Sequence, residues 1–289
     1  MNECNICPRK CNVDRTNTFG YCRMGHKPRV SKVMLHMWEE PCISGTKGSG
    51  AVFFSGCNLR CVFCQNYKIS QEEVGGEADA HRLADIFLSL ESKGAHNINL
   101  VNPTHFIPAI AAAIDISRQN GLKIPFIYNT NGYEAIESLK LLDGKIQVYL
   151  PDIKYMNSEA SLKYSGASDY FTVCSEAVKE MYRQVGVPKF DQCGIIIKGL
   201  IIRHLILPSL SKDSLSILNF IAENFPKDIF VSIMSQYIPY YKADRFPKIN
   251  RKLTKFEYDR VLEHFYSLGM DNGYMQERES ASNDFIPEF

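Results

Sequence analysis

The sequence predicts an α/β fold, a partial (βα)6 TIM-like barrel preceded by a small Cys-rich N-terminal appendage. From about residue 51 onward, short apolar runs alternate with stretches of helical periodicity, and six such units can be counted. The 289 residues, 45% of them hydrophobic and 22% charged, suffice for one large core. Seven of the ten cysteines stand in two groups before residue 65, which sets the front of the chain apart.

The six expected strands are short and rich in β-branched or aromatic residues, as strands of a buried parallel sheet usually are. They span residues 51–55, 97–101, 124–128, 146–150, 201–207 and 229–234. Because six units are fewer than the eight that close a barrel, we expect an open, curved sheet with one accessible side. The chemistry of such a sheet belongs at the carboxyl ends of its strands.

Amphipathic segments between these strands predict the helices that cover the sheet. Leu83, Phe87 and Leu90 recur at helical spacing after the first strand, and Gly94 follows them as a C-cap. The same pattern predicts further helices over residues 106–117, 211–224 and 254–268.

The net charge and the apolar runs of the sequence indicate which partners and which cell compartment to expect. The net charge of +1, from 33 basic and 32 acidic side chains, gives no electrostatic reason to expect a nucleic-acid or membrane partner. The start of the chain shows no secretory signal, and no apolar run reaches the roughly 20 residues of a spanning helix. We therefore expect a cytoplasmic protein whose cysteines bind metal rather than form disulfides.

The front of the chain is expected to be a separate, metal-ordered segment over residues 1–45, with the barrel over residues 46–289. The front segment lacks the alternation of the barrel and contains four closely spaced thiols, Cys4, Cys7, Cys11 and Cys22. Four soft ligands complete a tetrahedral zinc site or hold an iron–sulfur cluster without an open iron. The alternative is a set of reduced thiols packed against the barrel.

Three further cysteines, Cys57, Cys61 and Cys64, share the loop that follows the first expected strand. Three thiolates satisfy three of the four irons in a cubane cluster, and the loop supplies no fourth thiolate. One iron is then left open to bind and activate a small molecule. The alternatives are a zinc site, which normally takes a fourth protein ligand, or three buried free thiols.

The spacing Cys57-x-x-x-Cys61-x-x-Cys64, in this setting, resembles the radical S-adenosylmethionine (SAM) superfamily. Within it, the chain is similar to the pyruvate formate-lyase-activating enzymes, and more closely to an uncharacterised branch of activating-enzyme-like iron–sulfur proteins. The similarity extends over nearly the whole chain. It includes Glu39-Glu40-Pro41, Gly48-Ser49-Gly50, residues 97–105 and residues 128–133.

This resemblance implies a catalytic [4Fe-4S] cluster on the three cysteines, which cleaves SAM to methionine and a 5′-deoxyadenosyl radical. It also implies that the radical abstracts hydrogen from a glycine of a partner glycyl-radical enzyme, with an electron donor such as flavodoxin or ferredoxin. The chief alternative is a radical SAM enzyme acting on a small molecule, peptide or RNA, of which RNA is least favoured by the small net charge. A second alternative is a non-enzymatic iron–sulfur electron carrier.

Further residues are expected to bind SAM by the same resemblance. The activating enzymes carry a Gly-Gly-Glu-Pro motif after the second strand, and Asn102 and Thr104 stand at that position here. Asn129 and Thr130 match an Asp-Thr pair at a strand end of that group, with Asn in place of Asp.

Charged residues after the fourth strand and within the fifth are also candidates for SAM binding. Asp152 and Lys154 match an Asp-x-Lys of the activating enzymes, and their spacing puts both on one face of an extended segment. The alternative is a solvent-exposed pair. Arg203 interrupts an apolar strand, so its charge needs a partner, either a carboxylate of SAM or substrate or an internal salt bridge. Near the end of the chain, Tyr274, Gln276 and Glu277 are candidates for a cap over the pocket or for surface positions.

Overall fold

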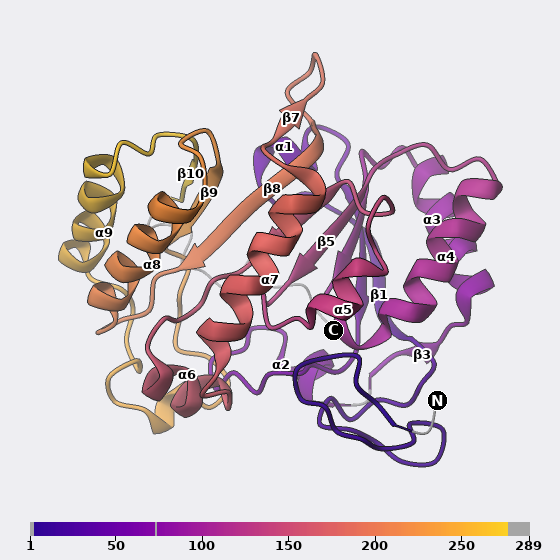
Figure 1. The fold of residues 1–289 in the computed structure, drawn as a ribbon, viewed down its shortest axis with the longest axis horizontal. Helices are drawn as coiled ribbons and strands as arrows, with labels where there is room; N and C mark the ends of the chain where they lie inside the picture. The colour runs from indigo at the N-terminus through magenta and orange to yellow at the C-terminus, as the bar shows by residue number, and fades with distance from the viewer. Residues whose placement is uncertain (1–2, 73, 277–289) are drawn as a thin grey trace.

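A curved sheet forms the centre of the computed structural model, which describes residues 3–72 and 74–276. From one edge to the other it runs β10 (Gly273–Met275), β9 (Phe230–Met234), β8 (Ile196–Leu205), β6 (Val148–Pro151), β5 (Phe126–Thr130), β4 (Ile98–Val101), β2 (Ser49–Phe54), β1 (Arg29–His36) and β3 (Gly76–Glu77). A further strand, β7 (Lys189–Phe190), pairs with β8 away from this path. Figure 1 shows the arrowheads of β5 and β8 directed towards the same end of the molecule.

Seven strands, β2, β4, β5, β6, β8, β9 and β10, pair in parallel, which confirms the α/β prediction. Six of them correspond to the strands expected from the sequence, and β10 adds a seventh at one edge. On the other side, β1 runs antiparallel to β2, and β3 runs antiparallel to β1. Over the described residues, the edge strands β10 and β3 do not pair with each other, so the sheet stays open as predicted.

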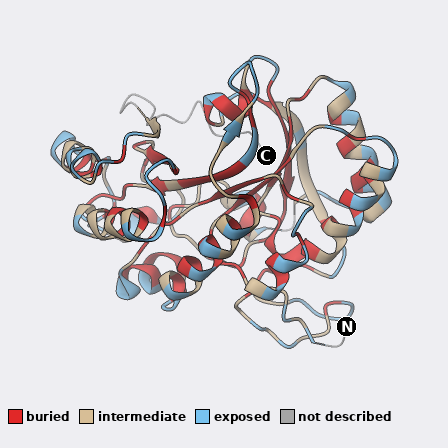
Figure 2. Ribbon diagram, turned by 45° about the horizontal axis from the view of Figure 1, so that its top comes forward, coloured by how far each residue is buried: buried red, intermediate tan, exposed pale blue. Residues whose placement is uncertain are grey.

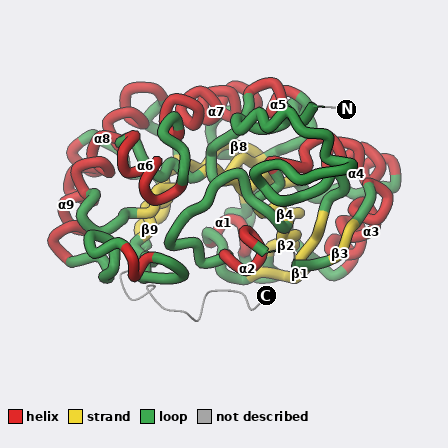
Figure 3. Tube along the Cα trace, turned by 90° about the horizontal axis from the view of Figure 1, so that it is seen from below, coloured by secondary structure: helices red, strands yellow, loops and turns green. Residues whose placement is uncertain are grey.

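Helices cover the outer face of this sheet in an arc that Figure 3 shows from below. They are α3 (Ala80–Ser92), α4 (Ile107–Gln119), α5 (Ile136–Lys140), α6 (Ser158–Ser165), α7 (Tyr170–Val185), α8 (Ser211–Asn224) and α9 (Lys255–Ser267). Two short helices, α1 (Pro41–Ser44) and α2 (Tyr67–Gln71), lie on the inner side of the arc. Short 3-10 turns occupy Thr104–Phe106 and Ala243–Arg245. None of the helices in the described part of the chain combines the length and apolar character needed to cross a membrane.

Side chains of each strand alternate between the two faces of the sheet, so two cores form. On the outer face, Phe126 of β5 meets Phe87 of α3 edge-on, with ring centroids 5.2 Å apart. On the inner face, Ile43 of α1 belongs to a smaller core with Ile127, Val148, Leu150 and Ile201. Figure 2 shows that the buried residues follow the strands and the sheet-facing sides of the helices.

Along the inner face of the sheet, polar residues follow the apolar ones towards the carboxyl ends of the strands. Asn129, Asp152 and Arg203 each stand two residues after a member of the inner core, so the alternation directs them to the same face. The apolar core with α1 thus fills the amino-terminal half of the inner face. The carboxyl half is left to polar side chains, which is where parallel sheets carry their ligand sites.

Part of the front segment expected over residues 1–45 belongs to the sheet. Residues 29–36 form β1, and Val30 pairs with Phe54 while His36 pairs with Ser49. Most residues of β1 are only half-buried, so this strand lacks the apolar run that marks the parallel strands in the sequence. Residues 3–28 form neither helix nor strand, and Figure 1 shows this indigo segment at the same end of the molecule as α2 and α6.

Candidate active site at the carboxyl end of the sheet

A cavity of about 280 Å³ opens at the carboxyl ends of the parallel strands. Loops after β2, β4, β5, β6 and β9 contribute to its wall, together with the loop between β1 and α1. The cavity brings together all three cysteines of the central loop and most of the residues expected to bind SAM. These are Cys57, Cys61, Cys64, Asn102, Asn129, Thr130, Asp152, Lys154 and Arg203.

The central cysteine loop turns away from β2 at Gly56, whose φ of 82° is unfavourable for residues with a side chain. A Cβ atom at Gly56 would lie 2.4 Å from Cγ of Met24 and 2.7 Å from the carbonyl oxygen of Cys22. The glycine therefore serves two needs, a left-handed turn and close contact with the front segment. Both place Cys57 at the start of the loop.

Each sulfur atom of the three cysteines has a polar neighbour, as thiolate ligands of a metal commonly do. Two N–H groups and one hydroxyl donate to sulfur, and a second hydroxyl lies within hydrogen-bond distance of the third sulfur. The contacts are Leu59 N and Asn131 Nδ2 to Cys57 Sγ, both at 3.4 Å, Ser165 Oγ to Cys61 Sγ at 3.0 Å, and Ser70 Oγ beside Cys64 Sγ at 3.3 Å.

Burial controls the protonation of these thiols in the absence of metal. It raises the pKa of Cys57 to about 12 and that of Cys64 to about 11, and the neighbouring thiolates add to the effect. Burial also raises the pKa of Cys61, although the charge of Lys154 opposes it. A metal that binds here must therefore displace protons from the thiols, as thiolate sites do.

The donor set fits an iron–sulfur cluster better than a single ion. Over residues 3–72 and 74–276, no three His, Cys, Asp or Glu side chains converge as they would around one metal ion. A zinc ion draws each sulfur to about 2.3 Å from one point, whereas a cubane cluster places each thiolate on a different iron. No fourth cysteine is among the residues that line the cavity, so the three thiols leave one iron of a cubane without a thiolate.

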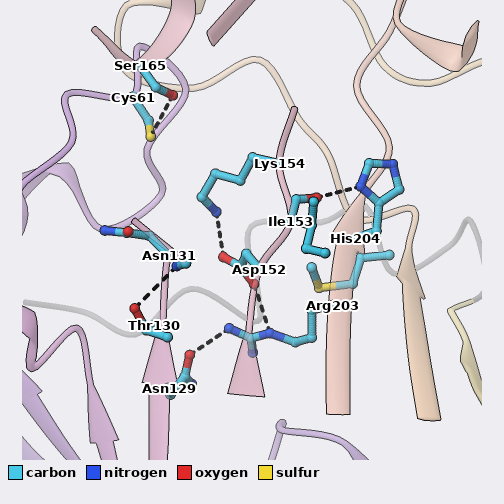
Figure 4. Close-up of polar contacts among 12 residues, drawn as sticks. Cys61, Asn129, Thr130, Asn131, Asp152, Ile153, Lys154, Ser165, Arg203 and His204 are labelled. Atoms are coloured by element: carbon cyan, nitrogen blue, oxygen red, sulfur yellow. Dashed lines mark hydrogen bonds and ion pairs between the residues drawn. The ribbon is translucent and has the colours of Figure 1, made fainter. Parts of the chain in front are cut away.

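Opposite the cysteines, Arg203 lies at the centre of a polar network (Figure 4). Its Nε donates to Oδ1 of Asp152 at 2.9 Å, Nη1 lies 3.3 Å from Oε2 of Glu39, and Nη2 donates to Oδ1 of Asn129 at 2.6 Å. The second oxygen of Asp152 accepts from Nζ of Lys154 at 2.5 Å. Asp152 therefore lies between two cations. The internal salt bridge expected as one alternative for Arg203 is present, and Arg203 also lines the cavity.

Asp152, Lys154 and Arg203 stay ionised in this network. Burial alone would raise the pKa of Asp152, but the charges of Arg203 and Lys154 hold it below its usual value. Burial alone would lower the pKa values of Lys154 and Arg203, and the carboxylates beside them raise both instead. The side chains of Asp152 and Lys154 are only 14% and 15% exposed, so the alternative of a solvent-exposed pair is wrong.

Glu39 is a functional candidate that the sequence did not single out by its chemistry. Its Oε1 accepts from Nδ2 of Asn99 at 3.0 Å and from Nδ2 of Asn129 at 3.2 Å, and its other oxygen faces Arg203. The loop between β1 and α1 carries it onto the inner face, where it lines the cavity. The neighbouring Glu40 is buried as well, and burial raises its pKa against the opposing charge of Arg203.

Two asparagines tie the strand ends to the cysteine loop. Asn102 adopts a positive φ of 56°, donates from Nδ2 to the carbonyl of Gly56 at 2.5 Å, and places Oδ1 3.6 Å from Cys57 Sγ. Asn131, which was not among the expected site residues, donates to Oδ1 of Asn58 at 2.8 Å as well as to Cys57. The only sequence signal for Asn131 was its place in the Tyr-Asn-Thr-Asn-Gly-Tyr segment.

Thr104, in contrast, is not brought to the cavity. It is fully buried and donates its hydroxyl to Oε1 of Glu134 at 2.6 Å. Thr130 bonds to the same carboxylate, although it also lines the cavity. Burial raises the pKa of Glu134 to about 7, while the two hydroxyl groups oppose this shift.

The front cysteines lie outside the cavity. Cys7 and Cys22 are buried, and Cys4 and Cys11 are half-buried. Burial raises the pKa of Cys7 to about 12, and electrostatic repulsion from Cys22 and Cys4 adds to this shift. The backbone N–H of Tyr21 donates to Cys11 Sγ at 3.2 Å.

The front segment is anchored on the central cysteine loop. Arg9 donates from Nε to the carbonyl of Asn58 and from Nη1 to the carbonyl of Gly166, both at 2.8 Å. Of the residues expected to form a cap, Tyr274 in β10 and Gln276 after it do not line the cavity, and Glu277 lies outside the described residues.

The comparisons with known proteins agree with this geometry. Residues 51–200 match the Radical SAM superfamily. The chain is 32% identical over 270 residues to the uncharacterized protein MJ0674 of Methanocaldococcus jannaschii, a match over 90% of this chain and 73% of that protein. It is 24% identical over 270 residues to the uncharacterized protein MJ0808 of the same organism, covering 85% of this chain and 73% of that one.

Two crystal structures share the fold at low sequence identity. Streptococcus suis SuiB bound to precursor peptide SuiA matches with a TM-score of 0.53 and 17% identity, over 76% of this chain and 46% of that chain. HydG, a maturase of the [FeFe]-hydrogenase, matches with a TM-score of 0.51 and 16% identity, over 78% and 50%. The chain thus spans about half the length of these two proteins.

The polar network makes a prediction about stability. Asp152→Asn removes the negative charge between two buried cations, and we expect it to lower the free energy of unfolding by about 3 kcal/mol. Adding Lys154→Met should restore part of this loss, because it removes the cation that Asp152→Asn leaves without a carboxylate, whereas Arg203 keeps Glu39. Urea unfolding of the purified chain, followed by circular dichroism, measures both effects.

A matched control is Asp143→Asn, which removes a carboxylate that is 46% exposed and paired with Arg183. It should cost less than about 1 kcal/mol. If Asp152→Asn is no less stable than this control, the buried cations do not depend on the charge of Asp152, and the prediction is wrong.

Proposed function

We propose that this chain, which belongs to the radical SAM superfamily, cleaves SAM reductively at a [4Fe-4S] cluster held by Cys57, Cys61 and Cys64. The observation that carries the proposal is that these three thiols share one cavity with a buried set of opposite charges. When bound, the cluster supplies one electron, which splits SAM into methionine and a 5′-deoxyadenosyl radical.

The residues facing the cysteines suit the amino-acid end of SAM. The carboxylate of Asp152 is available to the amino group, and Lys154 and Arg203 offer positive charge to the carboxylate. Glu39 and Asn129 hold the guanidinium of Arg203 in place through two of its nitrogens. The site is therefore built before its ligand arrives, which lowers the cost of ordering it on binding.

Apolar side chains form the rest of the wall and keep water from the reacting atoms. They include Phe53, Phe63, Leu205, Met234 and Ile238. A carbon radical formed inside such a wall meets few groups that quench it other than the intended substrate.

We further propose that the hydrogen donor is a glycine of a partner glycyl-radical enzyme. The support is the resemblance of the sequence to the pyruvate formate-lyase-activating enzymes, together with the open sheet, which leaves one side of the site accessible. Trp38 lines the cavity and is 65% exposed, so the cavity reaches the surface, where a loop of a partner has access to it.

We also propose that Cys4, Cys7, Cys11 and Cys22 bind a second metal, as zinc or as an iron–sulfur cluster. The support is the presence of four soft ligands within the first 22 residues and the backbone N–H donated to Cys11.

The radical chemistry is tested by anaerobic reconstitution with iron and sulfide, reduction with dithionite, and quantification of 5′-deoxyadenosine after SAM is added. The wild-type chain should form 5′-deoxyadenosine. Cys61→Ser should form none, because one of the three ligands is lost. Cys193→Ser, at an exposed thiol outside both cysteine groups, is the matched control and should behave as the wild type. Product formation by Cys61→Ser would contradict the assignment.

The front site is tested by measuring iron and zinc per chain in Cys7→Ser and in the wild type. We expect the wild type to contain zinc, or more iron than one cubane holds, and Cys7→Ser to lose that excess only. Equal metal contents in the two proteins would rule out a second site.

The substrate proposal is tested with a peptide spanning the glycyl-radical loop of pyruvate formate-lyase, with its glycine deuterated at the α-carbon. Because the 5′-deoxyadenosyl radical takes the glycine hydrogen, mass spectrometry should detect deuterium in 5′-deoxyadenosine. The same peptide with alanine labelled in place of glycine is the control. Product without deuterium would exclude glycine as the donor and favour a different substrate for the same radical.

A further inference from the structure

The loop that carries Cys61 has a second, outer face. Arg60 and Val62, the neighbours of Cys61, line a separate hollow of about 270 Å³. The rest of its lining is Arg23, Gln71, Glu72, Tyr241 and Lys242. None of these residues lines the cavity that contains the three cysteines. The loop is therefore a wall one residue thick between the cysteine cavity and this hollow, here called the outer groove.

The outer groove is positively charged. It contains Arg23, Arg60 and Lys242 against one carboxylate, Glu72, and none of the three cations forms an ion pair with a described residue. Arg23 and Arg60 donate instead to the carbonyls of Gln71 and Tyr21, at 2.9 Å and 3.1 Å. Their charges are held in place and left uncompensated.

The segment that supplies Arg23 is also basic in composition. Residues 1–30 contain six Lys and Arg residues against two acidic residues, and two of the six, Lys27 and Arg29, pair with Glu77. A surface of one charge sign steers oppositely charged partners and raises their association rate. The chemistry that fits the outer groove is thus an acidic protein surface.

The groove is also rigidly joined to the cysteine loop. The N–H groups of Arg60 and Val62 donate to the carbonyls of Ser165 and Tyr164, at 3.1 Å and 2.9 Å. The carbonyl of Val62 accepts from the N–H of Lys242 at 2.9 Å. A partner in the groove meets fixed backbone, so docking leaves the positions of the cysteines unchanged.

If the chain has the function proposed above, its need for an external electron identifies the kind of partner that the outer groove binds. Each cleavage of SAM consumes one electron, which must come from outside the chain, and electron transfer slows steeply with distance. During turnover the inner side of the loop is occupied by SAM and substrate, which leaves the outer side for the donor. We propose that the outer groove docks an acidic one-electron carrier protein, which is oxidised by one electron as the cluster is reduced by one.

The test uses the cluster-loaded full-length chain and reduced flavodoxin as the acidic carrier. Arg23→Glu combined with Lys242→Glu reverses the charge of the groove without touching Arg60, which contacts the Tyr21 ring. The rate of cluster reduction, followed by loss of visible absorbance, should fall by about tenfold or more with flavodoxin. With dithionite, a small molecule that needs no docking surface, the rate should stay within about twofold of the wild type.

The matched control is Lys189→Glu combined with Lys212→Glu, two exposed lysines in β7 and at the start of α8 that do not line the groove. Flavodoxin and dithionite should each reduce the cluster of this control as fast as that of the wild type. An unchanged rate with flavodoxin in the groove variant would overturn the proposal. So would an equal slowing with dithionite, which indicates a disturbed cluster, or an equal slowing in the control, which indicates a general charge effect.

Binding supplies a second readout that needs no SAM. Oxidised flavodoxin should bind the cluster-loaded chain about tenfold more weakly after the two groove substitutions, and the wild-type affinity should fall as salt is added. Because neither measurement requires SAM cleavage, the two proposals can fail separately. Groove-dependent reduction without 5′-deoxyadenosine would refute the radical chemistry alone, and the reverse result would refute the docking site alone.

Discussion

The buried guanidinium of Arg203 is the constraint around which the site is organised. A cation on the inner face of a sheet costs several kcal/mol unless it is paired and hydrogen-bonded. Here its partners come from three different parts of the chain: Asp152 after β6, Asn129 in β5 and Glu39 in the loop before α1. The partners of this one charge therefore fix the ends of two neighbouring strands and bring a distant loop into the wall of the cavity.

The cysteine loop depends on a second set of contacts, made with the front segment. Gly56 allows the carbonyl of Cys22 to approach, and Arg9 binds the carbonyl of Asn58. The front segment thus supports the outer side of the loop, while Asn102 and Asn131 hold its inner side. This arrangement gives the loop two working faces: one presents sulfur to the cavity, and the other presents positive charge to solvent.

Much of this architecture is predictable from local sequence. Parallel strands buried on both faces appear as short apolar runs, so all six expected strands occur, and the spacing of Cys57, Cys61 and Cys64 is itself local. β1 was missed because a half-buried strand has no such run. Glu39 was missed because it reaches Arg203 only through tertiary structure. Thr104 was expected at the cavity, but the 3-10 turn after β4 carries its hydroxyl to Glu134 instead.

The central claim is that three cysteines hold a cubane cluster with one open iron facing the network of Asp152, Lys154 and Arg203. Electron paramagnetic resonance of the reduced, cluster-loaded chain before and after addition of SAM tests it most directly. If SAM binds the open iron, the signal of the reduced cluster changes its g values, and Arg203→Met requires a higher SAM concentration for the same change. A spectrum unaltered by saturating SAM would contradict the account, because a cluster with four protein ligands has no iron to offer.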